Sequence, residues 1–142
     1  MPLQEFVLGN RRTALREGEM VTAILIPDDA AKANGHFLKL GSRQYLVISF
    51  VMVATLLEAD ANGSITQARI SVGACSEVAC RLADLEVDLI GVSLAEAGNI
   101  AAPNHLKDLS PISDIRATAE YRKDAALELV RRSLSACAEG LS

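Results

Sequence analysis

Cysteine and histidine are the side chains in this sequence best suited to bind a metal ion, and they are few. The cysteines are Cys75, Cys80 and Cys137, and the histidines are His36 and His105. Structural zinc sites usually combine two close pairs of such ligands, whereas no C-x-x-C pair occurs here. We therefore expect free thiols in a reducing compartment and no metal site.

Acidic residues at alternating positions are the other candidates for chemistry. Asp84, Glu86 and Asp88 fall within a segment that the sequence predicts to be helical. Residues two apart do not face each other on a helix, so the pattern favours a solvated face over a pair of catalytic carboxylates. The nine glycines are scattered, and neither a phosphate-binding loop nor a G-x-S-x-G turn is present. The residues alone thus predict no catalytic site.

Composition and charge narrow the class of protein. The 142 residues suffice for one domain, and half of them are hydrophobic. The net charge is −4 with no basic cluster, which argues against a nucleic-acid-binding surface. The longest apolar stretch, residues 45–57, is too short to span a bilayer. Charged residues crowd the first twenty positions, unlike a signal peptide. A soluble, cytoplasmic protein without a membrane partner is expected.

The first half of the chain has the pattern of antiparallel strands. We expect about four strands between Met20 and Cys75, at residues 20–26, 36–40, 47–57 and 65–75. Between the last two lies Asn62-Gly63, a strong hairpin signal because both residues tolerate a positive φ.

The second half changes to helical spacing, with about three helices expected after Val78, at residues 80–90, 93–101 and 117–139. Ser93 is expected to cap the second helix, and Asp114 the start of the third. On the third, Tyr121 is predicted to pack on the sheet and Arg122 to lie on the solvent face. Strands first and helices later predict an α+β fold, a small antiparallel sheet covered on one face by helices.

Four blocks of sequence resemble one protein family. The opening EFVLGNRRTALREGEMVTAILIP and the next block, FLKLGSRQYLVISFVMVA, resemble the F-x-G-x-R-x-T and F-x-K-x-x-x-R segments of flavoprotein subunits. ARISVGACSEVACRLADLEVDLIG and LSPISDIRATAEYRKDAALELVRRSL resemble the two later segments, in the same order. The chain is therefore similar to the C-terminal domain of the FAD-binding (medium) subunit of molybdenum hydroxylases, the xanthine dehydrogenase and carbon monoxide dehydrogenase flavoprotein family.

The resemblance implies a division of the chain and a set of partners. Residues 1–17 would be the lead-in from a missing FAD-binding domain, and residues 18–142 the C-terminal α+β domain. The family's partner subunits carry iron–sulfur clusters and a molybdenum cofactor, and electrons pass through the clusters to FAD. FAD is thus expected in the complete subunit, whereas this chain alone is expected to bind none and to be inactive.

Two residues are implied to approach the cofactor. In the family these are the apolar residue after the E-x pair, here Val21, and the lysine of F-x-K-x-x-x-R, here Lys39. Without the resemblance, a valine in a strand would be expected in the core, and a lysine at the end of a strand would be expected on the solvated surface. A second hypothesis also stays open, that of a stand-alone interaction domain without redox activity.

Overall fold

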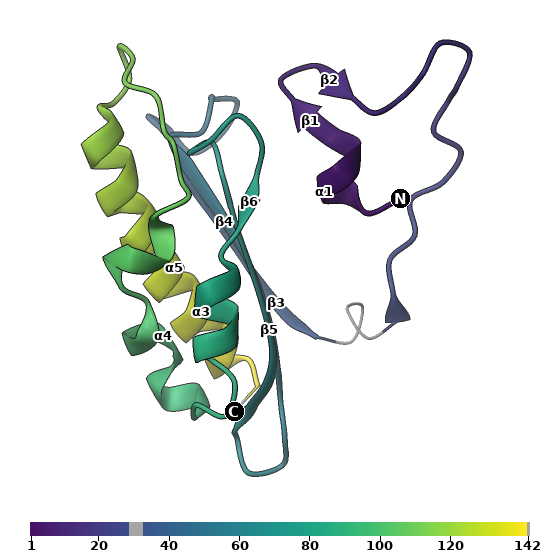
Figure 1. Cartoon of the computed structure of the whole chain (residues 1–142). Coiled ribbons are helices and arrows are strands. Elements are labelled where there is room, and N and C mark those ends of the chain that lie inside the picture. Colours follow the sequence, from purple (N-terminus) through teal and green to yellow (C-terminus); the bar gives the residue numbers. More distant parts are fainter. Residues whose placement is uncertain (29–32, 142) are drawn as a thin grey trace.

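The computed structural model describes residues 1–28 and 33–141. An antiparallel sheet of four strands forms the centre, in the order β3-β4-β5-β6. The strands are β3 (Asn34–Leu40), β4 (Val51–Ala59), β5 (Ile65–Gly73) and β6 (Cys80–Arg81). All helices that follow the sheet lie on one of its faces, while the N-terminal segment lies on the other side (Figure 1). The predicted α+β class is confirmed.

A tight hairpin joins β4 to β5 at the predicted Asn-Gly turn. Gly63 has a φ of 76°, a value that glycine adopts without strain. The Asp60 carboxylate accepts backbone hydrogen bonds from Asn62 at 2.9 Å and Ser64 at 3.0 Å. The Ser64 bond, followed by the Asn62 bond, lowers the pKa of Asp60. The turn sets the register that pairs Val53 with Val72 and Thr55 with Ile70.

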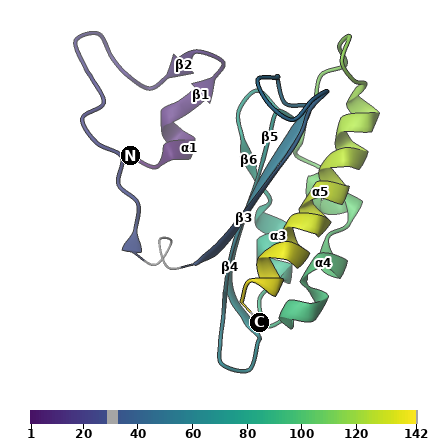
Figure 2. The same ribbon diagram turned by 180° about the vertical axis from the view of Figure 1, so that it is seen from behind.

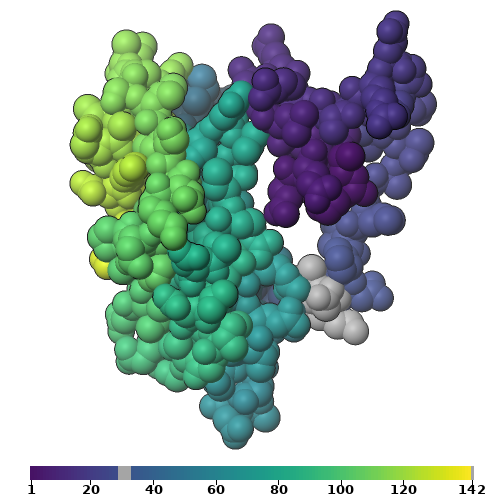
Figure 3. Space-filling model, in the orientation of Figure 1, coloured from purple at the N-terminus to yellow at the C-terminus, as the bar shows by residue number. Residues whose placement is uncertain are grey.

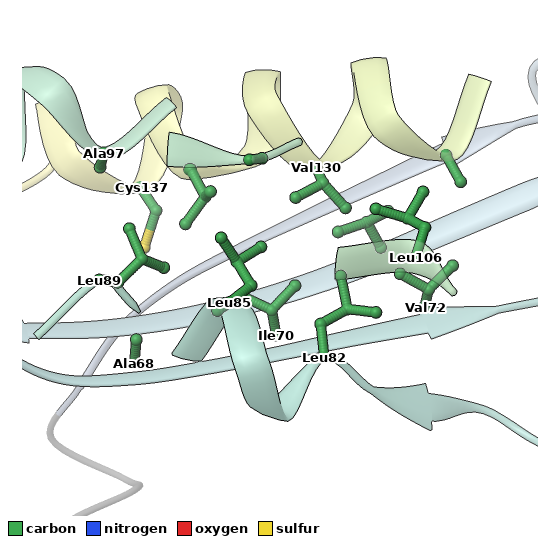
Figure 4. Close-up of a cluster of buried hydrophobic side chains, with 14 of the residues drawn as sticks. Ala68, Ile70, Val72, Leu82, Leu85, Leu89, Ala97, Leu106, Val130 and Cys137 are labelled. Carbon is green, nitrogen blue, oxygen red and sulfur yellow. The ribbon is translucent and has the colours of Figure 1, made fainter. Parts of the chain in front are cut away.

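The core lies between the sheet and the helices. Alternate residues of the two long strands point to the helices, among them Val51, Val53 and Leu57 on β4. Figure 4 shows Ala68, Ile70 and Val72 of β5 facing Leu85, Leu89 and Val130 across this layer. The core also encloses one polar pair. The Ser133 hydroxyl donates a hydrogen bond to Thr55 Oγ1 at 2.9 Å.

Short helices follow β6 in the chain and lie on the face of the sheet that carries the core. They are α3 (Ala83–Asp88), the 3-10 helix η1 (Leu94–Glu96), α4 (Ala97–Ile100) and the 3-10 helix η2 (Pro103–Leu106). The helix predicted from residue 80 starts at Ala83, because Cys80 and Arg81 pair with β5 as the last strand. Ser93 stands at the N-cap of η1, but its side chain makes no capping hydrogen bond to the described residues.

The long C-terminal helix α5 (Ala119–Glu139) crosses the sheet and packs on β3 and β4. Thr118 caps it by accepting a hydrogen bond from the Tyr121 backbone N–H, so the helix starts two residues after Ala117. Two predicted orientations are wrong. Tyr121 is 51% exposed, and Arg122 is buried at 3% exposure. The helical face that meets the sheet is therefore rotated toward Arg122. No helix among the described residues is long and apolar enough to cross a membrane.

The N-terminal segment forms a small unit of its own. Helix α1 (Leu3–Phe6) leads into β1 (Val7–Gly9), which pairs with β2 (Arg12–Thr13). Gly9 is buried, and a side chain there would collide with Glu77 in the loop between β5 and β6. This contact lies near one end of the main body, and elsewhere an open gap divides the two parts (Figure 3).

The strand predicted at Met20–Ile26 is wrong. This segment is extended and exposed, and it belongs to no strand of the described chain. The fourth strand of the sheet is β6 instead, so β3 lies at one edge of the sheet and β6 at the other. Figure 2 shows the segment's part of the chain standing away from β3, on the side opposite α5.

Candidate functional site

Lys39 lies on the sheet face that the helices leave open, which we call the open face. Along β3, Gly35, Phe37 and Lys39 are exposed, whereas their neighbours are half-buried beneath α5. The strand period of two thus places Phe37 and Lys39 side by side on one surface. Lys39 Nζ donates a hydrogen bond to the carbonyl of Val47 at 2.8 Å. This bond fixes a positive charge at the end of the edge strand.

The loop that accepts this bond, residues 41–50, carries exposed apolar side chains. Tyr45 is 72% exposed and Leu46 is 92% exposed. Leu46 has a φ of 51°, a left-handed conformation that costs energy in a residue with a γ-branched side chain. Arg43 Nη2 holds it by a hydrogen bond to the Leu46 carbonyl at 2.7 Å. Two cations, Lys39 and Arg43, therefore shape one exposed apolar loop.

The base of this loop is fixed from below by Arg122. The Phe50 backbone N–H binds the Leu40 carbonyl at 2.8 Å, and Arg122 Nη1 donates to the Phe50 carbonyl at 2.9 Å. Arg122 Nη2 reaches Asp114 Oδ1 at 2.9 Å, and the guanidinium lies 5.8 Å from the centre of the Phe50 ring. Asp114 accepts in addition the backbone N–H of Arg116, which is the main reason that its pKa is far below the usual range. The loop thus stands on a fixed support.

Asp114 does not cap α5 as predicted. Thr118 does so, while Asp114 binds the backbone N–H groups of Arg116 and Ala117 in the turn before the helix. Its second role, as the partner of a buried arginine, was not expected from the sequence.

A shallow depression also occupies the open face. It holds about 460 Å³ and is next to Phe37. Its lining combines apolar and basic side chains from all four strands of the sheet, including Ala54, Leu56, Arg69 and Arg81. A second depression of about 880 Å³ lies at the opposite end of the sheet, between the β4–β5 turn, Ser93 and the end of α5.

Two of the three alternating carboxylates, Asp84 and Asp88, lie on an exposed face as predicted, and each of the three has a partner of its own. Asp84 pairs with Lys107, and Glu86 with Arg81. Asp88 Oδ2 lies 3.0 Å from His105 Nε2, and His105 Nδ1 accepts the Ala102 backbone N–H. Because Nδ1 accepts a hydrogen bond it carries no proton, so Nε2 carries the proton and donates the hydrogen bond to Asp88. These pairs tie α3 to η2 and β6.

The thiols have the surroundings of structural cysteines. All three are free, and burial raises the pKa of Cys75 to about 11. Burial also raises the pKa of Cys137, whose Sγ lies 3.1 Å from the Asn34 carbonyl. Among the described residues, no group of three or more His, Cys, Asp or Glu side chains could hold a metal ion.

Val21, the other predicted cofactor residue, lies in the exposed N-terminal segment. It is 51% exposed. None of the hydrogen bonds within the described part of the chain connects its segment to Lys39 or to the loop at residues 41–50. The segment also stands away from β3 in both ribbon views, so the structure does not place it beside Lys39 (Figures 1 and 2).

Arg122 was expected on the solvent face, although the sequence contains a signal for its burial. It occupies the position three residues before Ala125 and four before Ala126, which α5 turns toward the sheet. A helical wheel centred on the buried Ala126 and Val130 would have included it.

Comparison with known proteins identifies the family of this chain. A family model described as the CO dehydrogenase flavoprotein C-terminal domain matches residues 36–137. The chain belongs to this family. The match begins within β3 and ends in the last turn of α5, so it covers nearly all of the sheet and its helices. The resemblance that the sequence indicates is thereby confirmed.

Named relatives agree with this assignment. The nicotine 6-hydroxylase medium subunit of Paenarthrobacter nicotinovorans is 32% identical over 131 residues, which is 92% of this chain and 45% of that protein. Quinoline 2-oxidoreductase of Pseudomonas putida 86 superimposes with a TM-score of 0.79 at 26% identity, over 96% of this chain and 47% of the other. Carbon monoxide dehydrogenase of Hydrogenophaga pseudoflava shares the fold, with a TM-score of 0.73 at 24% identity. This chain spans about half the length of these relatives.

Proposed function

We propose that this chain is the C-terminal domain of the flavoprotein subunit of a molybdenum hydroxylase, and that it takes part in electron transfer only together with an FAD-binding half. The parent enzyme would also include iron–sulfur and molybdenum cofactor subunits. Family membership and the 32% identity to a medium subunit support this assignment. The free thiols are compatible with the cytoplasm, which we propose as its compartment.

The observation that carries the proposal is the cationic end of the open face. Lys39 projects there beside an apolar, aromatic surface formed by Phe37 and the loop at residues 41–50. A flavin presents a flat apolar ring with polar edges, and its reduction adds negative charge. An immobilised ammonium group next to exposed apolar side chains suits the edge of such a ring.

The same residues do not suit the rest of the cofactor. A pyrophosphate is usually gripped by backbone N–H groups of a glycine-rich loop at a helix N-terminus, and no loop of that kind occurs in this sequence. This chain would therefore contribute a charge and a surface to the ring, whereas the phosphates would be bound by the other half of the subunit. FAD, when bound, supplies the redox chemistry.

In this arrangement Lys39 sets the local electrostatics. Its hydrogen bond to the Val47 carbonyl holds the ammonium group in place, so the charge does not have to be reorganised when the flavin is reduced. A fixed positive charge stabilises the reduced, more negative form and raises the flavin's potential. We propose that Val21 contacts the cofactor as well, through apolar packing.

The test uses a full-length subunit, which we call the joined subunit. In it, this chain replaces the matching part of the nicotine 6-hydroxylase medium subunit. Lys39→Met should lower the midpoint potential of the bound flavin by an amount on the order of tens of millivolts, since solvent screens a charge at an exposed site. Lys123→Met is the matched control, because Lys123 is an exposed lysine of α5 away from the open face. Coincident potentials for wild type and Lys39→Met would refute this role.

A further inference from the structure

The sequence contains two Asn-Gly pairs that are chemically alike but have different surroundings. Asn34-Gly35 begins strand β3, and Asn62-Gly63 lies in the turn between β4 and β5. Asparagine followed by glycine is the sequence most prone to lose its side-chain amide. Glycine has no side chain to hinder the approach of its backbone nitrogen to the asparagine Cγ atom. The fold decides which of the two pairs can react.

The reaction requires a flexible backbone between the two residues. The glycine nitrogen must lose its proton and reach the asparagine Cγ atom, and this movement requires rotation about the ψ angle of the asparagine. Strand pairing and side-chain hydrogen bonds prevent this rotation until the local structure opens. The rate therefore depends on how much structure has to open at each site.

Asn34 is held by its backbone and by its side chain. It pairs with Leu57 of β4, and Gly35 pairs with Leu56. Its side-chain nitrogen Nδ2, which would be the leaving group, donates a hydrogen bond to the Cys137 carbonyl in the last turn of α5. A reaction at Asn34 must therefore open the start of the sheet and its contact with α5.

Asn62 is exposed and is held by its own turn. The tip of the β4–β5 hairpin forms the lower end of the molecule in Figures 1 and 3. The hydrogen bond that must break joins the Gly63 N–H to the Asp60 carbonyl at 3.0 Å, and a bond of this type contributes about 1 kcal/mol. A Cβ atom built on Gly63 would meet no atom within 4 Å outside its chain neighbours. The turn can therefore open without disturbing the core.

We propose that Asn62 is a site of spontaneous covalent modification, in which its side chain is converted through a succinimide into isoaspartate and aspartate. The Gly63 nitrogen bonds to Asn62 Cγ and the Cγ–Nδ2 bond breaks. The proton of the Gly63 N–H leaves with Nδ2 as ammonia. Water then opens the ring at the main-chain carbonyl carbon to give isoaspartate, or at Cγ to give aspartate. The steps need no reactant besides water, and they do not depend on the proposed function.

Isoaspartate would change the hairpin in two ways. Its backbone runs through the former side chain and is longer by a methylene group, so the bond between Gly63 and Asp60 cannot keep its geometry. Its new carboxylate also lies two residues from that of Asp60, and like charges repel each other. The Gly63 carbonyl in addition accepts the backbone N–H of Leu94 at 2.9 Å. Modification of Asn62 should therefore loosen the contact between the hairpin and η1.

Peptide mapping by mass spectrometry, during incubation of the whole chain at pH 8, tests the proposal. In the folded chain Asn62 should be converted at least about 10-fold faster than Asn34, because the sheet must open before Asn34 can react. In concentrated urea, where neither pair is held, the two rates should agree within about threefold. The proposal is overturned if Asn62 reacts no faster than Asn34 in the folded chain, or stays unchanged there while the unfolded chain is converted. A rate difference of equal size in urea would contradict the fold as its cause.

Asn62→Gln provides a second, independent measurement, because glutamine would have to close a larger ring that forms more slowly. The fresh variant should unfold at the wild-type temperature, since the side chain is exposed in the turn. During incubation the unfolding temperature of wild type should fall by about 2–4 °C as Asn62 is converted, whereas that of Asn62→Gln should stay constant. An equal fall in both proteins would show that the modification of Asn62 does not weaken the hairpin, contrary to the proposal.

Discussion

Arg122 offers the sharpest test of how the open face is supported. It is the buried cation that joins α5 to the loop at residues 41–50 and to the turn at Asp114. Arg122→Met keeps most of the side-chain volume but removes both hydrogen bonds. The Phe50 carbonyl would lose a charged donor at 2.9 Å, and Asp114 would lose one of its partners.

The expected cost follows from these contacts. A hydrogen bond to a charged group contributes about 1.5–3 kcal/mol. The loss at Asp114 is smaller, because its side chain is 21% exposed and keeps its bond to Arg116. Against this, the buried Nε of Arg122 has no partner among the described residues, so methionine removes an existing penalty of about 1 kcal/mol. The balance is a loss of about 2 kcal/mol in the free energy of unfolding.

Urea denaturation followed by circular dichroism measures this value. The midpoint should fall while the m-value stays constant, since the fold is unchanged. Lys123→Met, the exposed neighbour on the same helix, should change the free energy by less than about 0.5 kcal/mol. Equal stability of Arg122→Met and wild type would show that the Arg122 contacts do not support the loop.

Three further predictions concern the same domain. Ser133→Ala should lower the free energy of unfolding by about 1–3 kcal/mol, because the buried Thr55 hydroxyl loses its partner. The double variant Ser133→Ala, Thr55→Val should be closer to wild type. A double-mutant cycle by urea denaturation checks this, and strictly additive effects would contradict it. Cys75, with its raised pKa and full burial, should resist iodoacetamide at pH 8 until the chain unfolds, and rapid native alkylation seen by mass spectrometry would count against the packing. Because the folded-state pKa of Asp114 is depressed, its contribution to stability should be complete above about pH 4 and be lost as the pH falls further. In Asp114→Asn the unfolding temperature should therefore depend less on pH below pH 4 than in wild type. Parallel plots of unfolding temperature against pH for the two proteins would refute this.

Much of the fold could be predicted because local signals agree with the tertiary structure. The Asn62-Gly63 turn and the alternation on both sides of it determine the β4–β5 hairpin, whose register is set within a few residues. The four family segments, read together, gave the correct domain even though no single one is specific.

The errors have physical causes. Met20–Ile26 has the composition of a strand, but composition does not say which sheet a strand joins, and the sheet of this chain takes β6 instead. Arg122 has a charge that usually means exposure, and only its long-range bonds to Phe50 and Asp114 allow burial. The helical spacing of Arg122 with Ala126 and Val130 agrees with burial, but the distant partners that make this burial possible cannot be read from the spacing.

Titration with FAD tests the central claim most directly, that this domain serves a flavin only as part of a larger subunit. The isolated chain should purify colourless and bind no FAD at concentrations up to about 10 µM, which corresponds to roughly −7 kcal/mol, because it lacks a pyrophosphate-binding loop. The joined subunit should retain about one FAD per polypeptide, read from its absorbance after gel filtration. An isolated chain that binds FAD below 10 µM, or a folded joined subunit that retains none, would contradict the account.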